Sequence, residues 1–412
     1  MSQTPILYID LAPNPGGSHI SLAHLLRGLD RARWAPAVIL SQQNDITIFA
    51  EMGVPVMRVR TPQWEPKPTS LVDTVRQGGI GHFFRSAPII STIWHGGGSL
   101  RYWRRDILPV AKSLTPLIRS YKPALVHLNN SVALMRPGII AAWRAHVPVL
   151  IHSRSFDPIS IVDRQLLAPQ VSGMIFISRA VAQAQLQYLA SPPPYRIIPN
   201  AVDLAQFSSP KSPELVRQQL GVAATAPLVG MIGRIIPWKG QDVFVEAFAR
   251  LHKTYPQAMA VIIGEPDTFE GERYQAVIRK RVQELGLEDH ILWLGHRHDI
   301  PEIISALDVL AHCSVTPEPF GRVIIEGMAA GTPVIASNGG GAAEIVSDGV
   351  NGLLTEPGDA EALAAAMIKL LTDATLRERL RRNGRKTVQQ RYTMEAHVAA
   401  VTSFYEQLLS NL

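Results

Sequence analysis

The protein has 412 residues, of which 46% are hydrophobic and 18% are charged. This composition can bury a large core and excludes a disordered chain, and the length predicts about two domains. The one cysteine, Cys313, excludes an internal disulfide, so a cytoplasmic location is expected. Residues 1–10 lack the pattern of a signal peptide, and no run of about 18 apolar residues predicts a membrane-spanning helix.

Charge is distributed unevenly along the chain, whose formal net charge is +6. Residues 1–200 contain 20 Lys and Arg against 9 Asp and Glu, whereas the rest contains 20 against 25. The basic half is expected to meet an anionic partner, such as a phospholipid surface or a phosphorylated acceptor. Nucleic acid would also match this charge, but no nucleic-acid-binding motif is present, so it is not expected as a partner.

The first half of the chain alternates predicted strands with predicted helices. The chain begins with a predicted strand at 6–10 and a turn-rich loop, which are followed by an amphipathic helix over 20–29 and a strand at 37–40. This βαβ order predicts a parallel sheet with helices on its faces. Further strands are predicted at 125–128, 149–152 and 174–177. Residues 61–120 fit the pattern poorly and are expected to elaborate this sheet domain.

The second half repeats the alternation independently. Strands are predicted at 227–233, 260–264 and 291–295, and helices at 242–252 and 274–285. We therefore expect an α/β protein with two Rossmann-like βαβ domains. The expected divisions of the chain are 1–207, 208–390 and a C-terminal helical segment, 391–412.

Two carboxylates in the second half, Glu318 and Glu326, are separated by seven residues. A Pro/Gly loop follows the first, and the second falls early in an apolar helical run. The first-turn amides of such a helix can bind an anion. Because carboxylates accept hydrogen bonds, the pair suits the hydroxyls of a sugar and of a ribose.

Two further loops in the same domain suit a phosphate. Arg234 and Lys239 follow a predicted strand that ends at Gly233, and together a planar fork and a point charge can hold a diphosphate. Residues 339–341 are three glycines before a helix, which let backbone amides approach an anion. Each motif alone is typical of an ordinary surface loop. Their shared place at the carboxyl ends of strands indicates one ligand site.

These motifs resemble those of the retaining glycosyltransferase family 4, whose members have the GT-B fold. Glu318 and Glu326 match the family's E-x7-E motif, and residues 233–240 match its donor-phosphate loop. Residues 198–207 resemble the interdomain motif, with Ala201 where glycine is usual. The resemblance is more specific in the second half of the chain than in the first.

The resemblance implies a role for particular side chains. It implies as catalytic residues Glu318, His152, Arg234 and Lys239. It implies as donor-binding residues Gly16, Gly17, Gly233, Arg234, Lys239, Phe320, Gly321, Arg322 and Glu326. In this scheme Glu318 holds sugar hydroxyls, Glu326 holds the ribose, and the cations neutralise the diphosphate. No metal and no cofactor are expected beyond the nucleotide-diphosphate sugar, which is a co-substrate.

We therefore expect a metal-independent hexosyltransferase that retains anomeric configuration and moves a sugar to a polysaccharide, glycolipid or small-molecule acceptor. Its site is expected in a cleft between the domains, with the final helix crossing back to the first. The basic, aromatic stretch 83–105 is expected to contact the acceptor or an anionic membrane, at the periphery of the cytoplasm. A nucleotide-sugar epimerase of the same fold and a non-catalytic sugar-nucleotide-binding protein stay open as alternatives.

Overall fold

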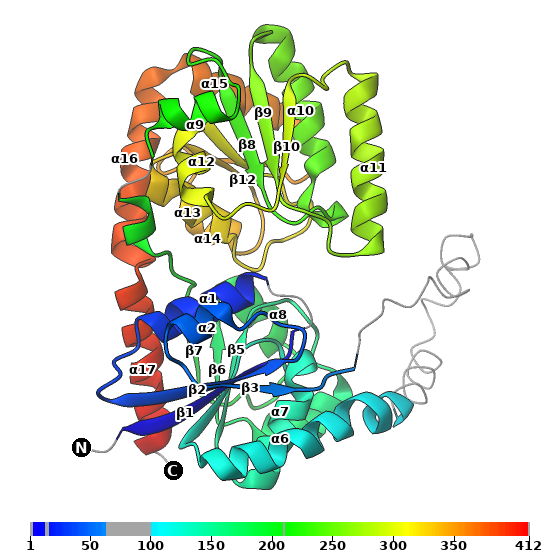
Figure 1. The fold of residues 1–412 in the computed structure, drawn as a ribbon, viewed down its shortest axis with the longest axis vertical. Helices are drawn as coiled ribbons and strands as arrows, with labels where there is room; N and C mark the ends of the chain where they lie inside the picture. Colours follow the sequence, from blue (N-terminus) through cyan, green and yellow to red (C-terminus); the bar gives the residue numbers. More distant parts are fainter. Residues whose placement is uncertain (1–2, 13–15, 63–99, 209–210, 411–412) are drawn as a thin grey trace.

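A computed structural model describes residues 3–12, 16–62, 100–208 and 211–410. The chain forms two lobes, each a wholly parallel sheet between helices (Figure 1). This is the predicted α/β architecture of two Rossmann-like units. Most of the stretch 83–105 lies outside the described residues, so its predicted contact with a membrane or acceptor stays a prediction.

The N-terminal lobe contains a seven-stranded sheet in the order β3-β2-β1-β4-β5-β6-β7. Its strands are β1 Thr4–Asp10, β2 Trp34–Ser41, β3 Val56–Val59, β4 Leu125–Leu128, β5 Val149–Ser153, β6 Gly173–Phe176 and β7 Tyr195–Ile197. Its helices include α1 Gly17–Arg27, α2 Thr47–Glu51, α6 Leu108–Tyr121, α7 Val132–Ala145 and α8 Arg179–Leu186. Nearly every residue of the central strands is buried, as expected when helices cover both faces of a parallel sheet.

The C-terminal lobe contains a six-stranded sheet in the order β10-β9-β8-β11-β12-β13. Its strands are β8 Leu228–Ile232, β9 Met259–Ile263, β10 Ile291–Gly295, β11 Val309–His312, β12 Val334–Ser337 and β13 Leu353–Thr355. Its helices include α9 Pro213–Gln219, α10 Gln241–Thr254, α11 Phe269–Glu284, α12 Ile300–Ala306, α13 Arg322–Ala330, α14 Ala342–Ile345, α15 Ala360–Thr372 and α16 Ala374–Arg391.

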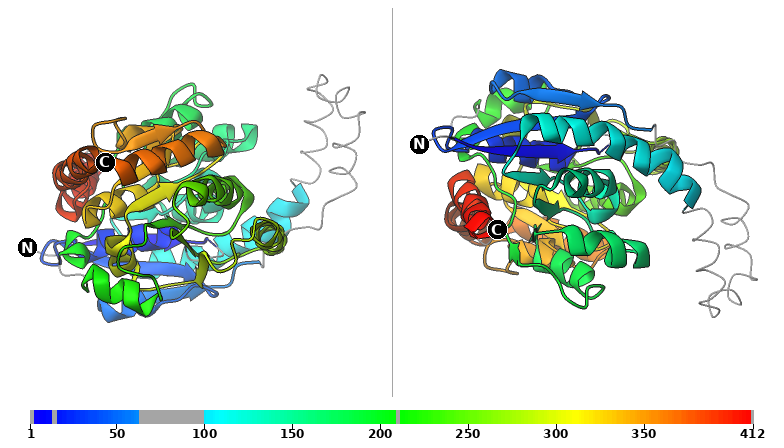
Figure 2. Two further views of the ribbon diagram at one scale, coloured as in Figure 1. Left: turned by 90° about the horizontal axis from the view of Figure 1, so that it is seen from above. Right: turned by 90° about the horizontal axis from the view of Figure 1, so that it is seen from below.

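The last helix, α17 (Met394–Ser410), leaves the C-terminal lobe and packs on the N-terminal one. It follows α16 along one edge of the molecule (Figures 1 and 2). Tyr405 is fully buried, and its ring meets the Trp34 ring edge-on at 5.6 Å. The last helix of the chain therefore contributes side chains to the core of the N-terminal lobe, which also contains the first strand.

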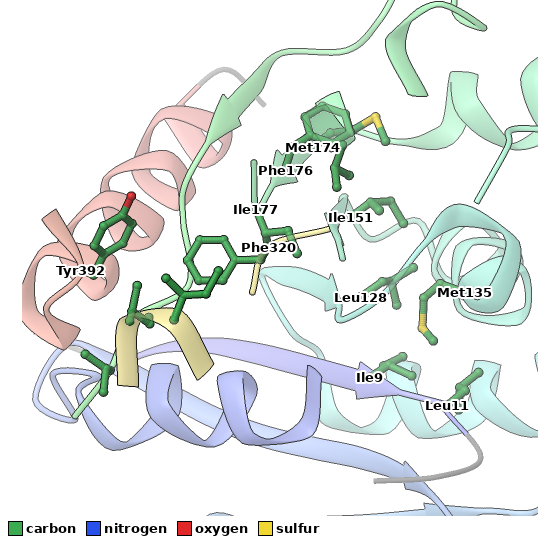
Figure 3. Packing of buried hydrophobic residues seen from close by; sticks show 14 of the residues in the cluster. Ile9, Leu11, Leu128, Met135, Ile151, Met174, Phe176, Ile177, Phe320 and Tyr392 are labelled. Carbon is green, nitrogen blue, oxygen red and sulfur yellow. The ribbon is translucent and has the colours of Figure 1, made fainter. Parts of the chain in front are cut away.

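An apolar contact joins the lobes beside the carboxyl ends of their strands. Phe320, which precedes α13, is 4% exposed, and its ring centroid lies 6.0 Å from that of Tyr392. In Figure 3 the Phe320 ring lies between Tyr392 and Ile177 of the N-terminal lobe, and all three belong to one buried cluster. The loops that follow the strands of the two sheets are thereby held next to each other.

Candidate active site

The loop after β8 places Lys239 at the edge of the C-terminal sheet. It ends at Gly240, whose φ is +74° and where a Cβ would lie 2.2 Å from the Cys313 carbonyl oxygen. Only glycine therefore lets the loop approach the end of β11 so closely. The Lys239 ammonium group lies over the face of the Trp238 ring, 4.2 Å from its centroid, where the ring attracts a cation.

Glu318 is the centre of a buried cluster. Its Oε2 accepts hydrogen bonds from Lys239 Nζ at 2.7 Å, Ser314 Oγ at 2.9 Å and His312 Nε2 at 3.2 Å. Burial opposes ionisation, but the charge of Lys239 and the His312 bond hold the pKa of Glu318 well below its ordinary value. The Oε1 atom accepts no hydrogen bond from any described residue. A ligand hydroxyl could therefore bind there without breaking the cluster.

Two helix N-termini, one from each lobe, meet near this cluster. Helix α13 begins after Gly321, whose φ is +95°, and α1 begins after Gly16; no described side chain caps either helix. Arg322 Nη1 lies 3.4 Å from the Gly17 carbonyl oxygen, and its Nη2 donates to Glu326 Oε1 at 3.0 Å. The partial positive charge of both helix starts and the Arg322 guanidinium group thus favour an anion here.

Arg234 does not join Lys239, although both lie on the same loop. Its Nη1 donates to Asp267 Oδ2 at 2.6 Å, and its side chain is half exposed. Gly233 lies beneath the Lys239 stem, with 3.8 Å between an added Cβ and Lys239 Cδ. The two predicted cations therefore extend toward different partners in this structure.

His152 lies in the N-terminal lobe, fully buried, and no hydrogen bond between described residues joins it to the Glu318 cluster. Its Nδ1 lies 3.3 Å from Arg154 Nη2 and 3.2 Å from His127 Nε2. Because arginine can only donate, Nδ1 must accept, and the His152 proton is assigned to Nε2. Burial, with the charge of Arg154, lowers the pKa of His152 well below its ordinary value, so the ring is neutral.

Arg154 was not anticipated from the sequence. Its Nε donates to Asn129 Oδ1 at 2.8 Å and its Nη1 to Asn200 Oδ1 at 2.5 Å, and burial lowers its pKa to about 9. The same chain of polar groups reaches Asp10 through Asn129 Nδ2 at 2.8 Å. Asp10, Asn129 and Arg154 each stand at or just after the end of a strand, and that position was the signal in the sequence.

The predicted residues thus fall into separate groups. Lys239 and Glu318 form one, joined by His312 and Ser314, which the site prediction omitted. Gly17, Arg322 and Glu326 form another, beside Gly16, Gly321 and the backbone of Phe320. Arg234 and His152 belong to neither. Among the described residues, no group of three or more His, Cys, Asp or Glu side chains has the arrangement of a metal site, and no helix is long and apolar enough to cross a membrane.

Comparison with known proteins relates both halves of the chain to glycosyltransferases. Residues 15–206 match the family model of Glycosyltransferase Family 4, and residues 213–387 match that of Glycosyl transferases group 1. The crystal structure of Anabaena Alr3699/HepE in complex with UDP and glucose is 26% identical, covers 97% of this chain and 99% of that one, and has a TM-score of 0.78. The chain therefore has the GT-B fold, and each of its two halves is similar to a glycosyltransferase family model.

Curated proteins of similar sequence are also glycosyltransferases by name. A lipopolysaccharide core biosynthesis glycosyltransferase, LpsE of Rhizobium meliloti, is 32% identical over 47% of this chain and 53% of its own length. A D-inositol 3-phosphate glycosyltransferase of Nocardia farcinica is 32% identical over 65% of this chain and 57% of its own length. The chain thus spans about half the length of the curated relatives it matches.

Proposed function

We propose that the protein transfers a sugar from a nucleoside diphosphate sugar to an acceptor hydroxyl. The observation that carries the proposal is the partly buried Lys239–Glu318 pair beside two uncapped helix N-termini. Such an arrangement offers a cation and helix dipoles to a diphosphate, and a carboxylate oxygen to a sugar hydroxyl. An ordinary surface ion pair or glycine turn would not combine a cation, a carboxylate and two helix N-termini in one place.

The groups divide between the parts of the donor. Lys239, Arg322 and the starts of α1 and α13 face the diphosphate, while Glu318 Oε1 accepts from a sugar hydroxyl. Glu326 Oε2, which has no hydrogen-bond partner among the described residues, accepts from the ribose. We further propose that Arg234 leaves Asp267 to reach the diphosphate, and that His152 donates from Nε2 to the sugar.

The reaction we propose retains the anomeric configuration and requires no metal. The bond from the anomeric carbon to the phosphate oxygen breaks, and the acceptor oxygen attacks from the same face. The departing phosphate oxygen takes the proton of the acceptor hydroxyl, so no protein carboxylate serves as the base. The charge that develops on the phosphate is stabilised by Lys239, Arg322 and the two helix starts, a kind of interaction often worth several kcal/mol.

The relatives support this proposal on the donor and acceptor sides. The HepE structures hold UDP, UDP-glucose, or UDP and glucose, which supports a uridine diphosphate sugar as the first donor to try. The curated relatives are named for lipopolysaccharide core biosynthesis and for D-inositol 3-phosphate, and the second of these names a phosphorylated compound. The basic first half of this chain suits an anionic acceptor or contact with an anionic membrane.

The proposal is tested by following the sugar of each nucleotide sugar, with and without lipid and polysaccharide extracts. We expect nucleoside diphosphate release that depends on an extract, transfer with retention shown by NMR, and unchanged rates in EDTA. An isomerised nucleotide sugar formed without acceptor would instead establish the epimerase alternative. Binding of a donor without turnover by any extract would support the non-catalytic alternative. Loss of activity in EDTA with recovery in Mg²⁺ would contradict the metal-free step.

A further inference from the structure

A carboxylate of the C-terminal lobe lies on the first amides of a helix in the N-terminal lobe. Glu344, on α14, accepts from the Ala180 amide through Oε1 at 2.8 Å and from the Arg179 amide through Oε2 at 3.0 Å. These amides open α8, where a helix has no backbone partner to offer them. Each carboxylate oxygen thus satisfies one amide, and the negative charge lies at the positive end of the helix dipole.

The same helix start also holds the loop that carries Glu318. Ser178 Oγ accepts from the Val181 amide at 3.1 Å, which caps α8, and donates to the Pro319 carbonyl oxygen at 2.7 Å. Pro319 directly follows Glu318 in the sequence. The first turn of α8 in the N-terminal lobe therefore binds both Glu344 on α14 and the Pro319 loop of the C-terminal lobe.

The Glu318–Pro319 loop and the glycine loop before α14 are also hydrogen-bonded to each other. The Gly341 amide donates to the Glu318 carbonyl oxygen at 2.7 Å. At Gly340, φ is +58° and a Cβ would lie 2.2 Å from the Glu318 carbonyl oxygen, so a side chain there would separate the loops. Glu344 lies three residues after Gly341, in the short helix that this loop begins. The segment that leads into the Glu344 helix is thus hydrogen-bonded to the backbone of Glu318.

From these contacts we infer that Glu344 is a positioning residue that latches the two lobes together and sets the place of the Glu318 loop. The latch uses the charge of Glu344 and both of its oxygens, because each faces its own amide. Part of this inference, the consequence for turnover, rests on the proposed transfer reaction. The geometric part does not.

Hydrogen exchange of the full-length protein tests the geometric part, with Glu344→Gln and Glu344→Ala as variants. We expect the Arg179 and Ala180 amides to exchange about tenfold faster in both variants, because a charge-assisted bond to each is weakened or lost. The Val181 amide, held by Ser178, should keep its protection and so report that α8 is still folded. The matched control is Glu361→Gln, an exposed acid in the first turn of α15, which should leave all three amides unchanged.

Kinetics test the consequence for turnover. We expect Glu344→Gln to lower kcat about tenfold while UDP binding, measured by calorimetry, changes less than threefold, because the Glu344 side chain contacts none of the groups assigned to the nucleotide. Ser178→Ala, which removes the bond to Pro319, should have the same pattern if it folds. Unchanged exchange at Arg179 and Ala180 would overturn the latch. Unchanged kcat with faster exchange would overturn its role in positioning. A wild type that transfers no sugar while exchange behaves as expected would refute the proposed function and leave the latch standing.

Discussion

At the scale of single residues, the Glu318 carboxylate depends on its neighbours to stay charged in a buried place. Its side chain is 11% exposed, and only Lys239 among its hydrogen-bonding partners carries a permanent charge. Removing one partner of such a pair costs more than removing both, because an isolated buried charge remains. This asymmetry lets stability and function be separated by mutation.

We predict that Lys239→Met lowers transfer by about 100-fold or more, since it deletes a cation from the developing phosphate charge. The same change should lower the free energy of unfolding by about 3 kcal/mol, because Glu318 is left buried without its counter-charge. Lys239→Met combined with Glu318→Gln should recover much of the stability and none of the activity. The control is Lys253→Met, an exposed cation in the last turn of α10. Wild-type turnover in Lys239→Met would exclude this residue from the site.

At the scale of elements, α17 closes the polar interior of the N-terminal lobe. The His397 ring donates from Nδ1 to the Pro199 carbonyl oxygen at 2.7 Å, and the Tyr405 hydroxyl group is hydrogen-bonded to His127 Nδ1 at 2.5 Å. Burial lowers the pKa of His397 to about 4, despite the Pro199 bond, which acts in the opposite direction. The helix therefore carries a group that resists protonation while folded.

This lowered pKa predicts how stability depends on pH. Below about 6.5 the unfolded chain protonates His397 and the folded chain does not, so acid favours unfolding until the pH approaches the folded value. His397→Gln can still donate to Pro199 and cannot take a proton. We expect the variant to flatten the fall of unfolding free energy between pH 6.5 and 4 by up to about 1.4 kcal/mol per pH unit, measured by urea titration. Identical slopes for the variant and the wild type would contradict the assignment.

The packing of α17 on β6 gives a second prediction at this scale. A Cβ at Gly173 would lie 2.8 Å from Leu408 Cδ1 and 3.1 Å from Phe404 Cζ. Gly173→Ala should therefore lower the free energy of unfolding by about 1–3 kcal/mol through overpacking. In the double variant with Leu408→Ala, the two losses should be less than additive in a chemical denaturation cycle. Additive losses would show that α17 does not pack on this strand as described.

The elements that could be predicted are those whose sequence carries a long apolar run. β1, β2, β4 and β5 are buried on both faces and were anticipated to within a few residues. All three residues of β7 are exposed, and only one of the four residues of β3, Val59, is buried, so neither strand offers a pattern distinct from a loop.

The placement of candidate residues beside one another was predictable where they share a loop or a helix, as Arg322 and Glu326 do. It was not predictable where partners come from distant segments. The burial of His152 depends on Arg154, on His127 and on the return of α17, which no local pattern announces. The division of Arg234 and Lys239 between two partners likewise depends on Asp267 from another strand end.

At the scale of the whole molecule, the proposed function rests on two sheets whose carboxyl ends face each other. The Ser178–Pro319, Arg322–Gly17 and Glu344–Ala180 contacts each join one lobe to the other. Open α/β sheets bind ligands outside these ends, so a ligand held by both lobes would stabilise their junction as well as its own contacts. Donor binding should therefore raise the stability of the whole chain.

The most direct measurement of this claim is the thermal unfolding midpoint of the wild type in a panel of nucleoside diphosphate sugars. One sugar nucleotide should raise the midpoint by several degrees in proportion to the logarithm of its concentration, with a smaller rise for Lys239→Met combined with Glu318→Gln. If no nucleotide sugar moves the midpoint at millimolar concentration, or if the double variant responds as fully as the wild type, the residues described here do not hold an activated sugar.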